Sequence, residues 1–399
     1  MERLTAAFKP ESKYRAYFLS VMTFSLAYGL YKGVIDNYLA EIVGMSGFDK
    51  GVSEFFRELP GLLLVFILAA LYTFSAERIY KLGALFMLVG MAAQAVVPAS
   101  RVLVILCIFV YSLGDHIQLG MRNTLALQYS REGRGGEALG LQNAAQQVGT
   151  LVGFLAIIGT FALVRASAGL YRVVFAVSAG IIALGFLSSL RVTGDSAPDA
   201  HKRRFYFRKK YAKYYMLEVF YGARKQVFFT FGPFVLIRVY GMDTQHVAIL
   251  FAVAALFTAL WGGRLIGRLV DRWGYRNVMV WDTVVLFFVC LLYGFAKDLF
   301  PPCVAVAVVC VNYILDAVLS NASMATNLYA RTLSDSQEEL TATLSSGISV
   351  NHFVTVFYAL LGGWIWDRFG PGVLFATAAV MALANSAFAL TVPKPTRNT

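Results

Sequence analysis

The sequence predicts an all-α membrane protein of twelve transmembrane helices in two pseudo-symmetric halves of six. Hydrophobic residues make up 58% of the 399 residues and charged residues only 15%, whereas soluble domains carry about 25% charged residues. The apolar residues gather in runs that reach the roughly 20 residues needed to cross a bilayer. A tyrosine–glycine–lysine motif also occurs near the start of each half, as Tyr28, Gly29 and Lys32 and again as Tyr221, Gly222 and Lys225.

Twelve apolar segments follow one another along the chain. We expect the spans at about 14–43, 52–73, 82–99, 102–127, 138–164, 169–190, 212–240, 245–266, 277–296, 302–330, 340–366 and 371–392. The first is too long for a straight span and must tilt, bend or project from the membrane. It is also too long for the apolar part of a signal peptide, so we expect no cleavable signal.

The basic residues predict how the helices are oriented. Lysine and arginine fall mainly in alternate loops, and basic loops stay on the cytoplasmic side of a membrane. Both termini are therefore expected in the cytoplasm, with the chain in the cytoplasmic membrane. This distribution explains the net charge of +12 without a nucleic-acid partner. The four cysteines match no metal or haem spacing and indicate packing residues.

One long hydrophilic break divides the chain. It covers residues 192–213 and is rich in lysine and arginine. Binding of a regulator or a nucleic acid would also explain such a run, but a cytoplasmic linker lying against anionic headgroups fits a membrane protein better. The sequence thus predicts an N-terminal half over 1–191, this linker, and a C-terminal half over 214–399.

The segment between spans eight and nine carries a recognisable motif. It resembles the loop motif of the major facilitator superfamily, Gly-x-x-x-Asp-(Arg/Lys)-x-Gly-x-(Arg/Lys). We expect the first glycine to let two helices approach, the aspartate to bind a nearby arginine or to sit at a helix N-terminus, and the second glycine to form a tight turn. As a gate, this cluster would hold one conformation and release it in another. The residues are Gly267, Asp271, Arg272, Gly274 and Arg276.

A second, shorter copy of the motif ends span eleven, at Gly363, Asp367, Arg368 and Gly370. A repeat within each half is a property of this superfamily. The chain departs from the family pattern between spans two and three, where Thr73 stands near the expected aspartate. Span five lacks the proline of the drug–proton antiporter signature, although its glycine pair, at 149 and 153, predicts a close-packing face.

Charged and polar side chains inside the spans are the candidate site residues, because burying each costs several kcal/mol unless it is paired or hydrated. Helical periodicity places them in stripes on spans one, four, seven and ten, the four spans that line the central cavity in the superfamily that the chain resembles. The candidates for substrate binding are Tyr28, Lys32, Gln118, Arg122, Tyr221, Lys225 and Asn312. The candidates for proton coupling are Asp316, Asp115, His116, Asp36 and Glu218.

Asp316 comes first among these acids because its own helix offers no basic neighbour. Lys225 is the better counterpart of Lys32, since Arg224 is turned about 100° away from it on the helix. Local pairs, Lys32 with Asp36 and Glu218 with Lys225, are the structural alternative to a role in transport.

The resemblance implies a monomeric secondary transporter that moves a small organic solute by alternating access, coupled to a proton or another ion. Lys32, Lys225 and Arg122 would suit an organic anion. A proton-coupled exporter of amphipathic drugs is one alternative, and a membrane sensor or channel on the same fold is another. No phosphate-binding loop, catalytic cluster or metal-ligand pattern stands out, so we expect neither an enzyme nor a bound cofactor.

Overall fold

A computed structural model describes residues 6–10, 13–71, 73–193 and 207–394 of the chain. Within these ranges the regular elements are helices, apart from one isolated antiparallel bridge between Phe8 and Ser130. The chain forms two compact units. Unit 1 comprises residues 1–44, 56–203 and 243–249, and unit 2 comprises 45–55, 204–242 and 250–399.

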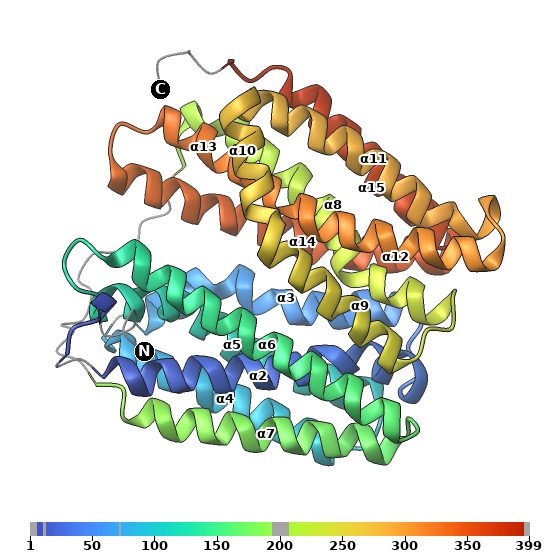
Figure 1. The fold of residues 1–399 in the computed structure, drawn as a ribbon, viewed down its shortest axis with the longest axis horizontal. Coiled ribbons are helices and arrows are strands. Elements are labelled where there is room, and N and C mark those ends of the chain that lie inside the picture. Colours follow the sequence, from blue (N-terminus) through green and yellow to red (C-terminus); the bar gives the residue numbers. More distant parts are fainter. Residues whose placement is uncertain (1–5, 11–12, 72, 194–206, 395–399) are drawn as a thin grey trace. The chain divides into compact units, whose positions relative to one another are not determined.

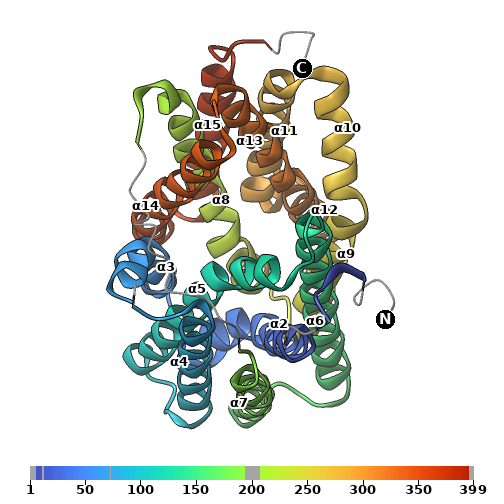
Figure 2. The same cartoon turned by 90° about the vertical axis from the view of Figure 1, so that its left-hand side faces the viewer.

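Unit 1 is a bundle of long antiparallel helices, drawn in blue to green in Figure 1. Figure 2 shows two of them, α4 and α7, nearly end-on. The helices of this unit are α2 (Tyr14–Asn37), the second part of α3 (Gly47–Ala70), α4 (Ala76–Val96), α5 (Arg101–Tyr129), α6 (Gly135–Leu163) and α7 (Ala168–Leu190). The predicted close packing at the glycines of span five is present, and it brings α6 against α2.

Unit 2 repeats this plan with more interruptions. Its helices are α8 (Ala212–Arg238), the second part of α9 (Thr244–Phe257), α10 (Gly263–Trp273), α11 (Tyr275–Leu299), α12 (Pro302–Leu319), α13 (Ser323–Leu333), α14 (Gln337–Phe369) and α15 (Pro371–Ala389). Aromatic rings fill the core between α8, α11 and α15, where Phe228, Tyr293 and Phe375 pack within about 5 Å of one another.

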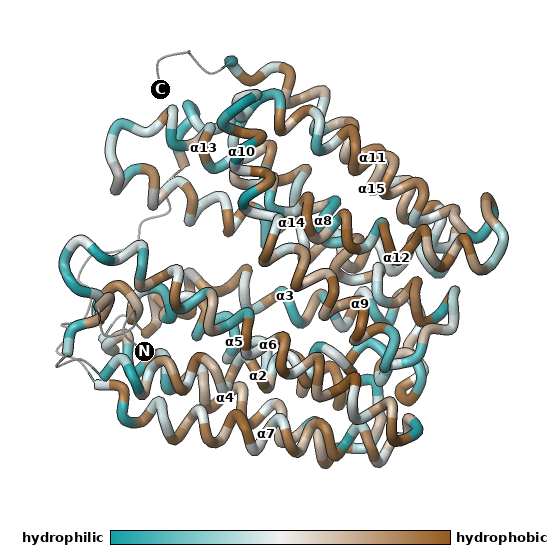
Figure 3. The backbone as a smooth tube through the Cα atoms, viewed as in Figure 1, coloured by the Kyte–Doolittle hydropathy of each residue, from teal (hydrophilic) through white to brown (hydrophobic). Residues whose placement is uncertain are grey.

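The helices have the length and composition of membrane spans. Ten stretches of the described residues are long and apolar enough to cross a bilayer. The other two expected spans coincide with α3 and α8, which are helical over 24 and 27 residues. Figure 3 shows hydrophobic residues along the helices and hydrophilic ones concentrated at helix ends and loops. The chain is therefore a multi-pass membrane protein.

Three of the expected spans are not uniform helices. The first continues from α2 into a π-helical turn, Tyr38–Ile42, which accommodates part of its extra length. The eighth is interrupted by a π-helical turn, Thr258–Gly262, and the tenth by a 3₁₀ turn, Ser320–Ala322. A Cβ atom at Gly262 would lie 2.6 Å from Nδ2 of Asn321, so the two interruptions are in contact.

Short segments close the polar ends of the bundles. Residues 6–9 pair with the loop after α5: the Lys9 amide donates to the Tyr129 carbonyl and the Arg131 amide to the Ala7 carbonyl, both at 2.9 Å. Most of the expected linker lies outside the described residues. Its last part forms a 3₁₀ turn, Lys209–Tyr211, directly before α8.

Candidate functional site

A buried charged pair of unit 2 joins Arg224 of α8 to Asp316 of α12. Arg224 is 2% exposed, and its Nη1 donates a hydrogen bond to Oδ1 of Asp316. The second terminal nitrogen, Nη2, is buried and has no hydrogen-bond partner. The acid that the sequence left without a basic neighbour on its own helix therefore takes one from the neighbouring helix.

Tyr221 supports this pair from the next turn of α8. Its ring centroid lies 5.6 Å from the Arg224 guanidinium carbon and 5.7 Å from Nζ of Lys225, so the ring face attracts both cations. The Tyr221 hydroxyl donates to the Ser320 carbonyl at 3.2 Å, at the 3₁₀ interruption after Asp316. Lys225, the predicted binding residue of this motif, is exposed, whereas Arg224 is buried.

Asp282 of α11 is a third member of this cluster that the sequence reasoning missed. Its charge interacts with that of Arg224, and its Oδ1 is buried without a hydrogen-bond partner. An acid inside an apolar span was the available signal. The cluster thus combines a buried donor, Arg224 Nη2, with a buried acceptor, Asp282 Oδ1, both unused by the described residues.

Glu218 lies one turn before Tyr221 on α8 and is also buried. It is within hydrogen-bonding reach of Asn351 of α14, and its charge interacts with that of Lys225. Gly222 lies between Glu218 and Lys225 in the sequence, and a Cβ atom on it would lie 3.1 Å from Asn351 Nδ2. The predicted stripe of Glu218, Tyr221 and Lys225 is therefore anchored to α14 at its first residue.

Two pairs of predicted site residues lie in unit 1, each within one helix. Lys32 donates to Asp36 at 2.8 Å along α2, and the Asp36 side chain is only 1% exposed. On α5, Nη2 of Arg122 lies 4.0 Å from Oδ1 of Asp115. The Nε of Arg122 is buried without a hydrogen-bond partner. Arg122 therefore keeps a donor that a bound solute could use.

Two of the predicted binding residues make contacts that favour packing. Gln118 is buried and its amide nitrogen donates to the Tyr80 carbonyl of α4 at 3.3 Å, which leaves its carbonyl oxygen for other partners. Asn312 donates to the Val308 carbonyl of its own helix at 2.7 Å. The structure thus gives Gln118 a bond between two helices and Asn312 a bond within its own helix, and their contact with substrate stays a prediction.

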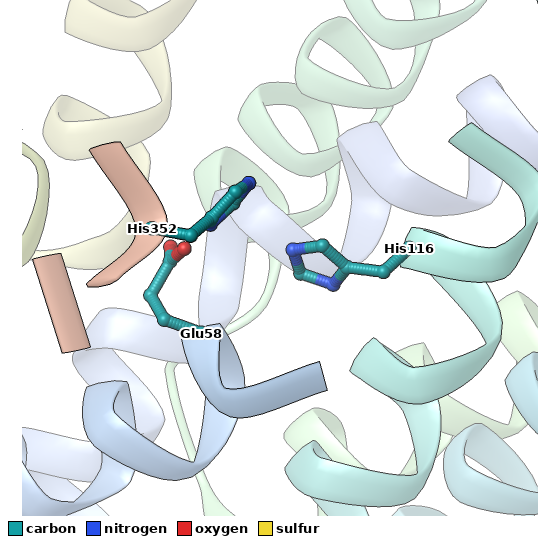
Figure 4. Close-up of side chains that lie close together, drawn as sticks. All are labelled: Glu58, His116 and His352. Atoms are coloured by element: carbon teal, nitrogen blue, oxygen red, sulfur yellow. The ribbon is translucent and has the colours of Figure 1, made fainter. Parts of the chain in front are cut away.

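His116 is buried on α5, where its Nδ1 lies 2.9 Å from the Ser112 carbonyl. Glu58 of α3 approaches it within unit 1, with potential ligand atoms of the two residues within 4.8 Å. Figure 4 shows both side chains; His352, also drawn there, belongs to unit 2. Two ligands are fewer than a structural metal site uses, so within unit 1 this pair indicates a polar contact between α3 and α5.

The repeated glycine of the tyrosine–glycine motif has the same kind of neighbour in both halves. A Cβ atom on Gly29 would lie 2.3 Å from the Thr150 carbonyl oxygen and 3.0 Å from the Gly153 Cα atom of α6. Gly222 faces Asn351 of α14, where a Cβ atom would lie 3.1 Å from the side-chain nitrogen and 3.3 Å from the carbonyl oxygen. Spans one and seven therefore use the motif glycine to approach spans five and eleven, which are equivalent in the two halves.

The gate motif at 267–276 is realised only in part. Gly274 has a φ of +78°, so the predicted glycine turn is confirmed. The prediction that Gly267 lets two helices approach closely was wrong, because a Cβ atom there would meet nothing within 4 Å. Asp271 and Arg272 are exposed, and Nε of Arg276 has no hydrogen-bond partner. The expected bond to Asp271 is absent from the contacts of the described residues.

The second copy of the motif shows all three features. A Cβ atom on Gly363 would lie 2.7 Å from the Gly47 carbonyl oxygen and 3.2 Å from Gly51 Cα. The Asp367 carboxylate accepts from the amides of Gly47 at 2.9 Å and Phe48 at 3.1 Å, which start α3. Gly370 turns with a φ of +88°. Residues 47–51 are thereby fixed to α14 within unit 2.

The start of α14 carries a separate charged cluster outside the spans. Lys210 donates to Asp335 at 2.8 Å and lies 2.7 Å from Glu339. Hydrogen bonds to Asp335 and then to Glu339 raise the pKa of Lys210 above its ordinary value. The end of the linker is therefore tied to the N-terminus of α14.

Comparisons with known proteins agree with this architecture. The model of the Major Facilitator Superfamily matches residues 17–337. A variant of the nucleoside transporter NupG superposes with a TM-score of 0.78 at 15% identity, covering 96% of this chain and 100% of that one. A D-xylose–proton symporter gives a TM-score of 0.70 at 13% identity, covering 96% and 99%. A POT family transporter in complex with 5-aminolevulinic acid gives 0.75 at 11% identity, covering 94% and 95%. A search of curated proteins found no match.

Proposed function

This chain belongs to the major facilitator superfamily, and we propose that it moves a small hydroxyl-bearing solute across the cytoplasmic membrane by proton-coupled alternating access. It is a secondary transporter rather than an enzyme, as its family and the transporters of the same fold indicate. We place both termini in the cytoplasm because the basic loops lie on their side of the membrane.

The pairing of the cations inside the spans favours a solute without net charge over the organic anion considered from sequence. Lys32 is bound to Asp36 and Arg224 to Asp316, and the charge of Glu218 acts on Lys225. An anion would have to displace a carboxylate of the protein from its cation. The same groups leave no large excess of positive charge to attract it.

The hydrogen-bonding groups that remain define the chemistry of the solute. Arg224 offers Nη2 as a donor and Asp282 offers Oδ1 as an acceptor. A hydroxyl group both donates and accepts, so it can satisfy a buried donor and a buried acceptor of one cluster. This pair of unused atoms in unit 2 is the observation that carries the proposal. A nucleoside and D-xylose, named for two carriers of this fold, are solutes of that kind.

Proton coupling is assigned to Asp316 because its partner lies on another helix. The other acids predicted for coupling interact with a cation on their own helix: Asp36 with Lys32, Asp115 with Arg122 and Glu218 with Lys225. Protonation of Asp316 would release Arg224 and loosen α12 from α8. The 3₁₀ interruption that starts at Ser320 would let the rest of that span move.

The substrate proposal is tested with purified protein reconstituted in vesicles. Hydroxylated neutral solutes, organic anions and amphipathic cations are screened first for thermal stabilisation and then for uptake. We expect uptake of a neutral hydroxylated solute. Uptake confined to anions or to amphipathic cations would contradict the proposal, as would discrete channel currents in a planar bilayer.

The role of Asp282 is tested by Asp282→Asn, with Asp298→Asn at the exposed end of the same helix as the matched control. A hydrogen bond to a charged group contributes roughly 1.5–3 kcal/mol. We therefore expect solute affinity to fall about 10- to 100-fold in Asp282→Asn and to stay unchanged in Asp298→Asn. Equal affinity in the two variants would remove Asp282 from the site.

A further inference from the structure

A basic pocket lies at the end of unit 1 that carries the start of α2. Its volume is about 850 Å³, within the range of pockets that bind small molecules. Four cations line it, and the described lining residues include no carboxylate: they are Pro10, Lys13, Tyr14, Arg15, Ala16, Leu19, Arg131, Ser188, Arg191 and Thr193. None of these residues belongs to the cluster assigned to transport.

The backbone at the pocket also favours an anion. Lys13 is the N-cap of α2 and makes no side-chain capping bond, so its side chain leaves the amides of the first turn of this 24-residue helix unused. The positive end of the helix dipole lies at the same place. The Arg131 guanidinium is positioned by a hydrogen bond from its Nε to the Phe8 carbonyl at 3.0 Å. A phosphate group has the charge and acceptors that these donors require.

Two exposed apolar stripes lead away from the pocket along its two helices. On α2, Arg15 is followed at helical spacing by Leu19 and Met22, which are 56% and 43% exposed. On α7, Arg191 is preceded by Leu187 and Leu184, which are 58% and 61% exposed. The helices touch at the pocket, where the Ser188 hydroxyl donates to the Ala16 carbonyl at 2.9 Å. Such a surface offers a phosphate site at its end and hydrocarbon contact along its length.

We infer that this pocket binds the phosphate headgroup of an anionic glycerophospholipid, whose acyl chains lie along α2 and α7. Headgroup binding between helices at the basic side of a membrane protein follows from the attraction of arginine and lysine to anionic lipids. The alternative source of the same chemistry is a soluble phosphate compound, which would need the cations but not the apolar stripes.

The test compares binding of phosphatidylglycerol to purified protein in a neutral detergent. The pocket variant carries Lys13→Gln, Arg15→Gln and Arg191→Gln. The control carries Arg78→Gln, Arg165→Gln and Arg368→Gln, three exposed arginines outside the pocket, so the two have the same net charge. Each cation near a headgroup is worth about a five-fold change in affinity. We expect affinity to fall roughly 100-fold in the pocket variant and to stay unchanged in the control. Equal binding by the pocket variant and the wild type would overturn the site.

Two further arms identify the source of the phosphate. Leu19→Gln should weaken phosphatidylglycerol binding and leave the weak binding of inorganic phosphate unchanged. If inorganic phosphate binds as tightly as the lipid, and Leu19→Gln has no effect, the lipid assignment is wrong. Should the triple variant fail to fold, Arg191→Gln alone must still show the five-fold loss. Phosphatidylcholine, which has no net charge, should bind more weakly than phosphatidylglycerol to the wild type.

Discussion

The Arg224–Asp316 pair shows how a charge can be kept inside a membrane bundle. Arg224 is almost fully buried and its charge is balanced by Asp316 on a different helix. Such a pair adds little net stability compared with apolar residues, but removing one partner leaves the other charge buried and uncompensated. The pair is thus suited to a site where protonation of one member changes the structure.

We predict strong coupling between Arg224→Gln and Asp316→Asn. Each single substitution should lower stability by about 3–5 kcal/mol, because it leaves a buried charge without its partner. The double variant should be more stable than Arg224→Gln alone, since Asp316 then no longer carries a charge that has lost its partner. Thermal unfolding of the four proteins in detergent measures this cycle. Additive losses would show that the two side chains act independently.

The sequence singled out residues of this cluster but not its pairing. Helical period and apolar context identified Tyr221 and Asp316, which the structure brings together around Arg224 and Ser320, and their role in transport stays a prediction. It favoured Lys225 over Arg224 and passed over Asp282. Helical periodicity relates residues on one helix only, whereas Arg224, Asp282 and Asp316 come from α8, α11 and α12. Pairs between helices depend on how the helices pack.

At the scale of single elements, the helix boundaries were predictable and the helix contacts were not. Hydropathy and length predicted the ends of α5 and α7 to within three residues of the observed ends, since burial in hydrocarbon demands a continuous apolar helix. The same motif appears at Gly267 and at Gly363. Of these two glycines, only Gly363 packs against the backbone of another helix, at the start of α3. A glycine in the sequence permits close approach, but the partner helix decides whether it occurs.

This difference gives a matched pair of substitutions. Gly363→Ala should lower the apparent melting temperature, because its Cβ would lie 2.7 Å from the Gly47 carbonyl oxygen and overpacking costs about 1–3 kcal/mol. Gly267→Ala meets open space and should stabilise α10 slightly, by roughly 0.5–1 kcal/mol. The measurement is the apparent melting temperature of each variant in detergent, compared with that of the wild type. A loss at Gly267 equal to that at Gly363 would contradict the structural difference between the two copies.

At the scale of the whole molecule, the chain repeats one plan in two units, and each contains a short segment from the other half of the sequence. Residues 45–55 belong to unit 2 and residues 243–249 to unit 1. The sequence boundary at 191 did not anticipate this exchange, because composition marks linkers and says nothing of which unit the first turns of α3 and α9 pack in. Within unit 2, the first of these segments is fixed by Asp367.

The orientation of the chain is tested with a native residue. Cys303 is exposed at the start of α12, at the end of that span predicted to face outward. A membrane-impermeant maleimide should label it in intact cells, and Cys303→Ser should abolish the label. A cysteine introduced by Arg78→Cys in that background, on the predicted inner side, should react only after permeabilisation. The reverse pattern would place the termini outside.

The most direct measurement is solute-driven proton movement in vesicles that enclose a pH-sensitive dye. The wild type and Asp298→Asn should couple a pH change to solute entry. Asp316→Asn, which keeps Arg224 Nη2 for the solute, should lose the pH change and still exchange solute at equilibrium, because the carboxyl that carries the proton is gone. Proton movement that still follows the solute in this variant would contradict the assignment of Asp316 as the proton carrier.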